Sequence, residues 1–232
     1  MSEPPTLEAS IHLLYEGFPA DVERFLDGLE RHSAAHSHEI VLVDNASGDG
    51  EWCETRASQS VRVIHLDRER GYADARNAGL KTSRGRIVIL VDLSVEPTGD
   101  FLGPILRAFD DPAVGVAGPW GLVSHDLREF AESPGPEVDA IEGYFLATRR
   151  ELLAAGLVHG KFRWYRHADI DLSFQLRALG TKAVVVTIPA VRHTHRGWES
   201  LDEAERAKRS KHNWNLFFDR WKQKAHDHDG PA

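Results

Sequence analysis

The first four apolar runs of the chain each end at an acidic residue. These residues are Glu16, Asp44, Asp67 and Asp92. A single acidic residue after a strand is commonly a turn former or helix cap, because its side chain accepts hydrogen bonds from free backbone N–H groups. Four such residues on one edge of a sheet would instead form a pocket that accepts hydrogen bonds. That pocket would bind a cation, or a polar ligand that carries hydroxyl and N–H donors.

Two later segments carry further polar groups at regular spacing. Asp169 and Asp171 lie at or before the first turn of a predicted helix over residues 168–180, where the helix dipole stabilises carboxylates. Either could be a helix cap, and we expect Asp171 to be one. His193 and His195 are two residues apart, so in an extended segment both would face the same side and could contact one ion or one phosphate.

Tyr72 and Arg76 lie four residues apart in an Ala-rich helical pattern over residues 72–82, so they share a face. The planar fork of donors on Arg76 could clamp a diphosphate, which a lysine would do less well. The alternative is a surface ion pair of Arg76 with Asp74 or Asp67.

Strands and helices in alternation would position these residues. Short β-rich runs occur at residues 11–15, 39–43, 61–66, 86–91, 114–117 and 182–188. Helical patterns, such as 20–32, lie between the early runs. This alternation predicts an α/β fold with a mostly parallel central sheet flanked by helices on both faces. Ligands of such sheets bind at the carboxyl ends of the strands, where the acidic residues fall.

Length and composition indicate one globular domain. The chain has 232 residues, 41% of them hydrophobic, and a formal net charge of −8. We expect a single domain over residues 9–224 between flexible tails at 1–8 and 225–232. The negative charge disfavours nucleic-acid partners. The polar N-terminal residues and the single cysteine, Cys53, fit a soluble cytoplasmic protein.

Five motifs follow one another in a recognisable order. They are VDNASGDG at 43–50, GYADARNAGL at 71–80, ILVDLSVEP at 89–97, ADIDLSFQLRALG at 168–180 and VRHTHRG at 191–197. In this order and at this spacing they resemble the family 2 glycosyltransferases of the GT-A fold, especially rhamnosyltransferase-like bacterial members. The resemblance extends over nearly the whole chain and implies the GT-A, or nucleotide-diphospho-sugar transferase, fold.

The resemblance also implies a set of nucleotide-sugar-binding residues. These are Tyr15, Glu16, Asp44, Asp67, Tyr72, Arg76 and Asp92. In the family, the carboxylate at the position of Asp44 accepts a hydrogen bond from the nucleotide base, which fits the imide N–H of uracil or thymine. The alternative role of Asp44 is to cap the turn that follows it. The resemblance favours the diphosphate clamp for Arg76.

The resemblance also implies a divalent cation, Mn²⁺ or Mg²⁺, although this chain lacks one of its usual carboxylate ligands. Family members usually carry Asp-X-Asp where this chain has Asp92 and Ser94, and serine is a weaker ligand for a hard cation. The resemblance implies Asp92, His193 and His195 as the metal ligands. If a cation does not bind there, either Arg76 and the histidines offset the leaving-group charge, or the protein no longer catalyses.

The resemblance assigns the catalytic base to Asp169, although Ala168 replaces the glutamate that precedes it in the family. It places the acceptor site ahead of this base, with Glu142, Trp164 and Tyr165 as candidates to hold a sugar. Aromatic rings there could equally belong to the core.

The predicted function is an inverting transfer of a sugar from a UDP, dTDP or GDP donor to a hydroxyl acceptor, which is a glycan, a lipid-linked molecule or a small molecule. The alternative is a non-catalytic nucleotide- or glycan-binding module of the same fold, to which Ser94 and Ala168 point. A nucleotidyltransferase is less consistent, because residues 15–18 lack a Gly-rich phosphate loop with Lys or Arg.

A last helix is predicted over residues 201–224, with basic residues beside Trp and Phe residues. We expect it to dock on the sheet. The alternative is peripheral contact with an anionic membrane, which would suit a lipid-linked acceptor.

Overall fold

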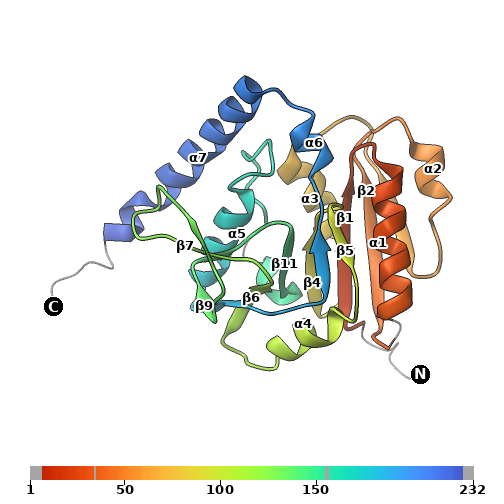
Figure 1. Cartoon of the computed structure of the whole chain (residues 1–232), viewed down its shortest axis with the longest axis horizontal. Helices are drawn as coiled ribbons and strands as arrows, with labels where there is room; N and C mark the ends of the chain where they lie inside the picture. The colour runs from red at the N-terminus through yellow and green to blue at the C-terminus, as the bar shows by residue number, and fades with distance from the viewer. Residues whose placement is uncertain (1–6, 34, 155–156, 227–232) are drawn as a thin grey trace.

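An eight-stranded sheet forms the centre of the computed structural model (Figure 1), which describes residues 7–33, 35–154 and 157–226. The strand order is β3-β2-β1-β4-β11-β6-β12-β9. The strands are β1 (Ala9–Tyr15), β2 (His38–Asp44), β3 (Val61–His65), β4 (Ile87–Val91), β6 (Val114–Gly118), β9 (Glu137–Val138), β11 (Phe145–Arg149) and β12 (Lys182–Val185). All six predicted strands are present, and the predicted run at 182–188 is shorter than expected.

The sheet is mostly parallel, as predicted. Strands β3, β2, β1 and β4 are parallel neighbours, and β12 is parallel to β6. The unpredicted strand β11 enters between β4 and β6 and is antiparallel to both. Its pairing is long-range, and no local pattern encodes such a pairing.

The remaining strands form two small sheets. One joins β10 (Ala140–Ile141), β7 (Gly121–Val123) and β8 (Ala131–Ser133). The other pairs β5 (Val95–Pro97), which directly follows β4, with β13 (Ala190–Arg192). This second pairing brings residues 190–192 close to the carboxyl end of β4.

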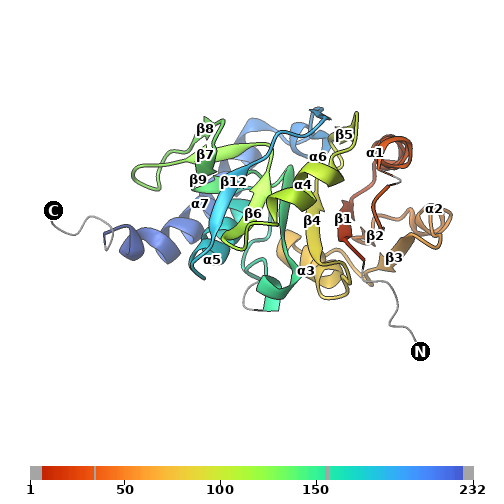
Figure 2. The same ribbon diagram turned by 90° about the horizontal axis from the view of Figure 1, so that it is seen from below.

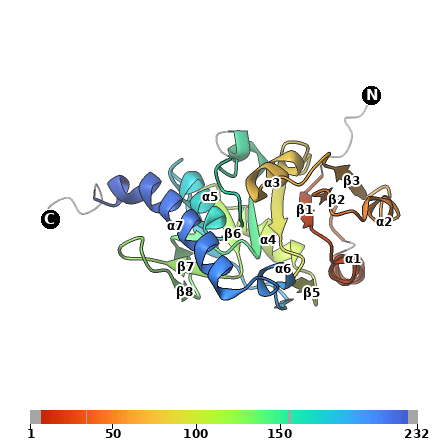
Figure 3. The ribbon, with the colours of Figure 1, turned by 90° about the horizontal axis from the view of Figure 1, so that it is seen from above.

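Helices cover both faces of the central sheet (Figures 2 and 3). They are α1 (Pro19–His32), α2 (Gly50–Glu54), α3 (Tyr72–Leu80), α4 (Leu102–Ala108), α5 (Ala168–Arg177), α6 (Arg196–Glu199) and α7 (Glu203–His226), with a 3₁₀ turn at Arg150–Ala154. Side chains alternate along β1, so Ile11 and Leu13 pack with α1 and α4, whereas Leu14 packs on the α3 side.

Four residues of the two predicted tails belong to the described part of the chain, namely Leu7, Glu8, Ala225 and His226. The backbone of Leu7 and Glu8 is paired, because Leu7 accepts from the N–H of Arg86 and Glu8 donates to Ser37. Helix α7 continues to His226. The other residues of the two predicted tails lie outside the described residues.

Helix α7 docks on the fold through its apolar side chains, which is the alternative that we favoured. Phe217 is fully buried against α5 and Phe130, and Trp221 is almost fully buried. In the described part of the chain, no helix combines the length and the hydropathy that crossing a bilayer requires.

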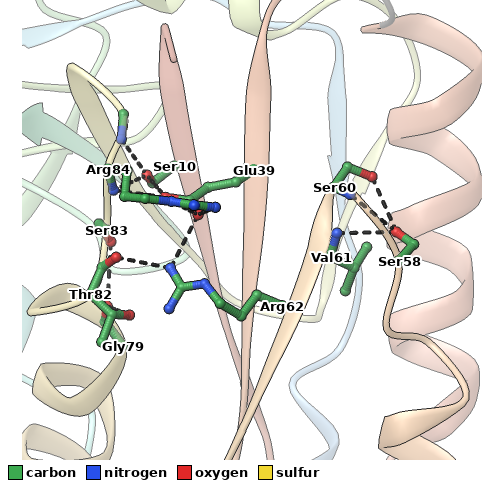
Figure 4. A network of polar contacts seen from close by, with 11 residues as sticks. Ser10, Glu39, Ser58, Ser60, Val61, Arg62, Gly79, Thr82, Ser83 and Arg84 are labelled. Atoms are coloured by element: carbon green, nitrogen blue, oxygen red, sulfur yellow. Dashed lines mark hydrogen bonds and ion pairs between the residues drawn. The ribbon is translucent and has the colours of Figure 1, made fainter. Parts of the chain in front are cut away.

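A buried carboxylate organises the amino end of the sheet (Figure 4). Glu39 of β2 accepts from Ser10 of β1 at 2.7 Å, from the backbone and guanidinium of Arg84 at 2.7–2.9 Å and from Arg62 of β3 at 3.1 Å. Three strands and the loop before β4 therefore meet at one anion. This network lies at the opposite end of the strands from the acidic residues considered above.

Candidate functional site

A cavity of about 370 Å³ lies at the carboxyl edge of the sheet. Seven of the predicted site residues line it, namely Glu16, Tyr72, Arg76, Asp92, Trp164, Tyr165 and His195. They come from the end of β1, the start of α3, the end of β4, the loop before α5 and the start of α6. Parallel strands end at the same edge, so residues far apart in the chain converge there.

Asp92 and His195 both line the cavity, and their side chains contact each other. Beyond the β5–β13 pairing, the N–H of His193 donates to the carbonyl of Ser94 at 2.7 Å. This contact holds the chain close to β4, and His195 Nε2 lies 3.2 Å from Asp92 Oδ2. The other oxygen of Asp92 accepts from the backbone and hydroxyl of Ser94. Burial raises the pKa of Asp92, but these bonds and the charge of His195 outweigh it and lower that pKa to about 2.

The ring of His195 is fixed by two further contacts. Its Nδ1 accepts from the backbone N–H of Trp198 at 3.1 Å and so caps α6, which leaves the hydrogen of a neutral ring on the Nε2 that faces Asp92. Tyr165 stacks on the imidazole with ring centroids 4.7 Å apart.

His193 does not share this site, contrary to the prediction that the two histidines contact one ion. Its Nε2 lies 2.7 Å from Glu96 Oε2, and its side chain is 40% exposed. The prediction assumed one extended segment, but the strand ends at Arg192 and the chain turns into α6 at His195.

Arg76 lies at the floor of the cavity and is 2% exposed. Its Nη groups donate to the ring and carbonyl of His12 at 3.1 Å and to the carbonyl of Val91 at 3.2 Å. Its guanidinium also lies over Tyr72, 5.4 Å from the ring centroid. The alternative of an ion pair with Asp74 or Asp67 is therefore wrong. Within the described residues, Arg76 keeps one buried N–H, at Nε, without a partner.

Glu16 contributes a second carboxylate to the cavity. Burial raises its pKa, and the charge of Arg76 and a hydrogen bond with Asn45 partly oppose this rise. The nearby charge of Asp92 raises it further. A cation entering the cavity would favour the ionised form of Glu16.

Tyr15 and Asp67 do not line the cavity, and their predicted role in binding the nucleotide sugar stays a prediction. Tyr15 shares the strand face of Ile11, so its fully buried ring stacks on Trp52 and its hydroxyl donates to Asp49 at 2.5 Å. Asp67 is exposed and forms an ion pair with Arg70 at 2.6 Å.

Asp44 lies at the same sheet edge but does not line the cavity. Its Oδ1 accepts from the backbone and hydroxyl of Ser47 at 3.0 and 2.7 Å, which is the turn-capping alternative, and its Oδ2 lies 2.9 Å from His65. Burial raises the pKa of Asp44, and these hydrogen bonds outweigh it and lower that pKa. Base recognition by Asp44 stays a prediction.

Asp169 lines a small recess beside the main cavity, and Tyr72 lines both. Its Oδ2 accepts from the N–H of Gly143 at 2.6 Å. Its Oδ1 is buried and has no hydrogen-bond partner among the described residues. Burial raises the pKa of Asp169, only partly offset by the N–H bonds to its carboxylate. Asp169 is therefore a carboxylate with one free oxygen, next to the cavity.

Asp171 is not a cap, contrary to our expectation. Its side chain is almost fully buried and accepts from Trp221 at 2.8 Å, from Arg220 at 3.0 Å and from Gln175 at 2.7 Å. It joins α5 to α7.

Two of the three acceptor candidates line the cavity. Trp164 and Tyr165 do so, whereas Glu142 is held by Arg192 at 2.7 Å and is not among the lining residues. Burial raises the pKa of Glu142, and the charge of Arg192 partly opposes this rise.

The comparison with known proteins gives the family. The family model described as glycosyl transferase family 2 matches residues 15–172, which is more than half of the chain and contains Asp44, Asp92 and Asp169. The chain belongs to glycosyl transferase family 2.

Two curated relatives match shorter stretches. Mouse dolichyl-phosphate beta-glucosyltransferase is 31% identical over 74 residues, which cover 29% of this chain and 23% of that protein. Succinoglycan biosynthesis protein ExoO of Rhizobium meliloti is 35% identical over 101 residues, covering 41% of this chain and 29% of that protein. The chain spans less than a third of the length of these relatives.

Solved glycosyltransferase structures share the fold. GalNAc-T7 with UDP, GalNAc and Mn²⁺ aligns with a TM-score of 0.75 and 15% identity over 97% of this chain and 50% of that chain. A mannosyltransferase of Pyrobaculum calidifontis with GDP-Man and Mn²⁺ aligns with a TM-score of 0.63 and 20% identity. The alignment covers 83% of this chain and 59% of that chain. The predicted GT-A fold is confirmed.

The cavity offers an incomplete set of metal ligands. Among the described residues, no three His, Cys, Asp or Glu side chains form a group that could hold a metal ion. Asp92 and His195 are adjacent and combine oxygen and nitrogen ligands that suit Mn²⁺. They fit a cation whose other ligands are phosphate oxygens and water.

Sequence reasoning missed several lining residues of the family 2 cavity. They include Phe18, Arg163, Arg196, Trp198, Leu201 and Arg209. Arg163 adjoins the predicted Trp164, and Arg196 and Trp198 lie in or directly after the VRHTHRG motif, so adjacency was an available signal. Arg209 gave no such signal, because only the path of α7 brings it back to the cavity.

Proposed function

We propose that this family 2 chain transfers a sugar from a nucleoside-diphosphate donor to a hydroxyl acceptor, with inversion at the anomeric carbon. One juxtaposition supports the proposal best. The Asp92–His195 pair lies in a cavity over Arg76, and Asp169, with a free oxygen, lies in a recess that shares Tyr72 with that cavity. A leaving-group site and a base are thus adjacent.

The donor occupies the main cavity in this proposal. The buried guanidinium of Arg76 and the imidazole of His195 offset the negative charge of the diphosphate, and the base and ribose extend toward the ends of β1 and β2. A divalent cation held by Asp92 and His195 would stabilise the charge that develops on the departing diphosphate. UDP, dTDP and GDP are the donor nucleotides to test.

The acceptor hydroxyl approaches Asp169 in this proposal. Its oxygen forms a bond to the anomeric carbon as the bond from that carbon to the diphosphate oxygen breaks, and Asp169 Oδ1 receives the hydroxyl proton. Attack from the face opposite the leaving group inverts the anomeric carbon. Because burial raises the pKa of Asp169, this carboxyl holds the proton well once it has received it.

Asp169→Asn tests the base. We expect transfer to fall by about 10²–10⁴-fold, the usual contribution of a general base, with donor affinity nearly unchanged. Asp110→Asn, an exposed residue after α4, is the control. Unchanged turnover of Asp169→Asn would exclude Asp169 from the mechanism.

The second candidate is a binding module without catalysis. Ser94 directs its hydroxyl to Asp92, and Ala168 is almost fully buried, so neither replaces the family carboxylate at its position. Titration of UDP, dTDP and GDP with and without Mn²⁺, followed by assays of donor-sugar hydrolysis and transfer to acceptors, separates the two. Nucleotide binding with no turnover would favour the module.

A further inference from the structure

The cavity lining holds more arginines than carboxylates, in a chain whose net charge is −8. The cavity lining includes five arginines and four carboxylates. The arginines are Arg70, Arg76, Arg163, Arg196 and Arg209, and the carboxylates are Glu16, Asp21, Glu69 and Asp92. Arg166 lies next to this lining, with its guanidinium over the ring of Trp198, one of the cavity residues.

Arg163 and Arg166 are exposed, and they differ from Arg70, Arg196 and Arg209 of the cavity lining in their ionic contacts. Neither has a carboxylate within 4.0 Å among the described residues. The others are paired, Arg70 with Asp67 at 2.6 Å, Arg196 with Asp21 at 3.4 Å and Arg209 with Glu205 at 2.8 Å. No carboxylate of the described residues therefore neutralises the charge of Arg163 or Arg166, and Arg166 also has a polar contact with the Tyr165 hydroxyl.

Aromatic rings orient these two guanidinium groups. Arg163 lies over Trp164 at 5.8 Å from the ring centroid, and Arg209 lies over the same ring at 5.4 Å. Arg166 lies over Trp198 at 4.6 Å. A guanidinium that contacts a ring through its face keeps its in-plane N–H groups free, and this edge matches the two oxygens of a carboxylate or phosphate.

The segment that carries both arginines is held from two sides. The fully buried Asn213 of α7 donates from Nδ2 to the carbonyls of Trp164 and Arg166, both at 2.7 Å. The N–H of Tyr72 donates to the carbonyl of Arg163 at 2.9 Å. The backbone of the two arginines is thus fixed between α3 and α7 before any ligand binds.

The position of Arg166 assigns this charge to the acceptor side. Arg166 lies directly before the N-cap residue of α5, three residues from Asp169, the residue that we propose as the base. The donor diphosphate, by contrast, is placed at Asp92, His195 and Arg76, where β4 and α6 meet. An anion beside Arg166 would therefore belong to the molecule whose hydroxyl approaches Asp169.

We propose that Arg163 and Arg166 form an acceptor subsite for an anionic group, a phosphate or a carboxylate carried by the molecule that receives the sugar. This inference rests on the proposed function, because it takes Asp169 as the base. It narrows the acceptor from any hydroxyl compound to a negatively charged one.

The test compares charged and neutral sugars of the same shape. Dissociation constants of glucose 6-phosphate and glucose, and of methyl glucuronide and methyl glucoside, are measured by ligand-observed NMR on the full chain, with and without saturating UDP and Mn²⁺. We expect at least one charged sugar to bind roughly tenfold tighter than its neutral partner, as charge-assisted hydrogen bonds would provide. Which charged sugar gains more distinguishes phosphate from carboxylate.

Variants assign the effect to the two arginines. Arg163→Gln and Arg166→Gln should each remove most of the gain for the charged sugar and lower UDP affinity by much less. Arg166→Lys should keep part of it, since the charge remains but the fork is lost. Arg31→Gln is the matched control, because Arg31 is also exposed, donates to a backbone carbonyl of α1 and does not line the cavity.

Two results would overturn the proposal. One is equal affinity for the charged and neutral sugars. The other is a loss of UDP affinity in Arg163→Gln and Arg166→Gln as large as the loss for the charged sugar, which would assign both arginines to the donor. Failure of the unaltered chain to bind any nucleotide would instead contradict the proposed function, and the measurements without UDP would still report on the subsite.

Discussion

Asp92 and His195 come from opposite halves of the chain and meet within 3.2 Å, whereas His193, two residues from His195, faces Glu96. At the scale of single residues, the role of a side chain therefore depends on the direction in which the backbone presents it. The two histidines give a matched pair of positions for testing the cation site.

His195→Ala should weaken Mn²⁺ binding to the UDP-saturated chain by about tenfold or more, because one of two protein ligands is lost. His193→Ala should leave it within about twofold, since His193 lies outside the cavity. Electron paramagnetic resonance of free Mn²⁺ measures both. Equal losses in the two variants would contradict the assignment of His195 as a ligand.

Mn²⁺ affinity should also rise with pH. Burial lowers the pKa of His195, but the hydrogen bond and charge of Asp92 outweigh it and raise that pKa above its ordinary value of 6.5. Below the raised pKa both ring nitrogens carry a proton, so no lone pair is open to a cation. The neutral ring has one proton, which moves to Nδ1 when a cation binds Nε2, with loss of the hydrogen bond from Trp198. Binding is therefore weaker below the raised pKa and strengthens as pH rises through it. Titrations between about pH 6 and pH 8 should show this dependence, and His195→Ala should lack it.

At the scale of elements, α7 holds the segments that carry the site. Its Asn213 binds the carbonyls of residues 164 and 166, and its Trp221 and Arg220 bind Asp171 in the first turn of α5. Helix α5 begins with the candidate base, so docking of α7 fixes both the aromatic edge of the cavity and Asp169.

Trp221→Phe should destabilise the chain by about 1–3 kcal/mol, because it leaves one oxygen of the buried Asp171 carboxylate without its N–H donor. Trp214→Phe is the control, since Trp214 is half-buried and stacks on Phe218. Urea unfolding measures both free energies. A smaller loss for Trp221→Phe than for Trp214→Phe would show that the hydrogen bond to Asp171 does not anchor α7.

At the scale of the whole molecule, the two ends of the sheet differ in how completely their polar groups are hydrogen-bonded. The carboxyl edge holds the cavity with its incompletely paired polar groups, and the amino edge holds the fully bonded Glu39 network (Figure 4). Stability and ligand binding should therefore respond to separate substitutions.

Glu39→Gln should lower the free energy of unfolding by about 1.5–3 kcal/mol at neutral pH, the value of hydrogen bonds to a charged group, and leave UDP affinity unchanged. Burial raises the pKa of Glu39, but the bonds from Arg84, Ser10 and Arg62 outweigh it and lower that pKa from 4.5 to about 2. The stabilisation is therefore fully present above 4.5 and is lost as pH falls toward 2.

Denaturant unfolding across this pH range checks the prediction. The difference between the unaltered chain and Glu39→Gln should shrink as pH falls. A constant difference would mean that the ionised carboxylate is not what stabilises the amino edge.

Much of the fold could be predicted from the sequence. Apolar runs alternating with helical patterns are local signals, and they gave every parallel strand and most of the helices. The acidic ends of the strands located the site at the carboxyl edge, because parallel strands bring their ends together whatever their side chains are.

Only the tertiary structure decided which of those residues share one cavity. Tyr15 follows the alternation of β1 into the core, Asp44 is bonded to its own turn and His65, and Asp67 lies in solvent. Arg209 reaches the cavity because α7 folds back over it. Orientation depends on strand register and long-range docking, which are set by packing between distant segments, and residue type and local spacing do not encode that packing.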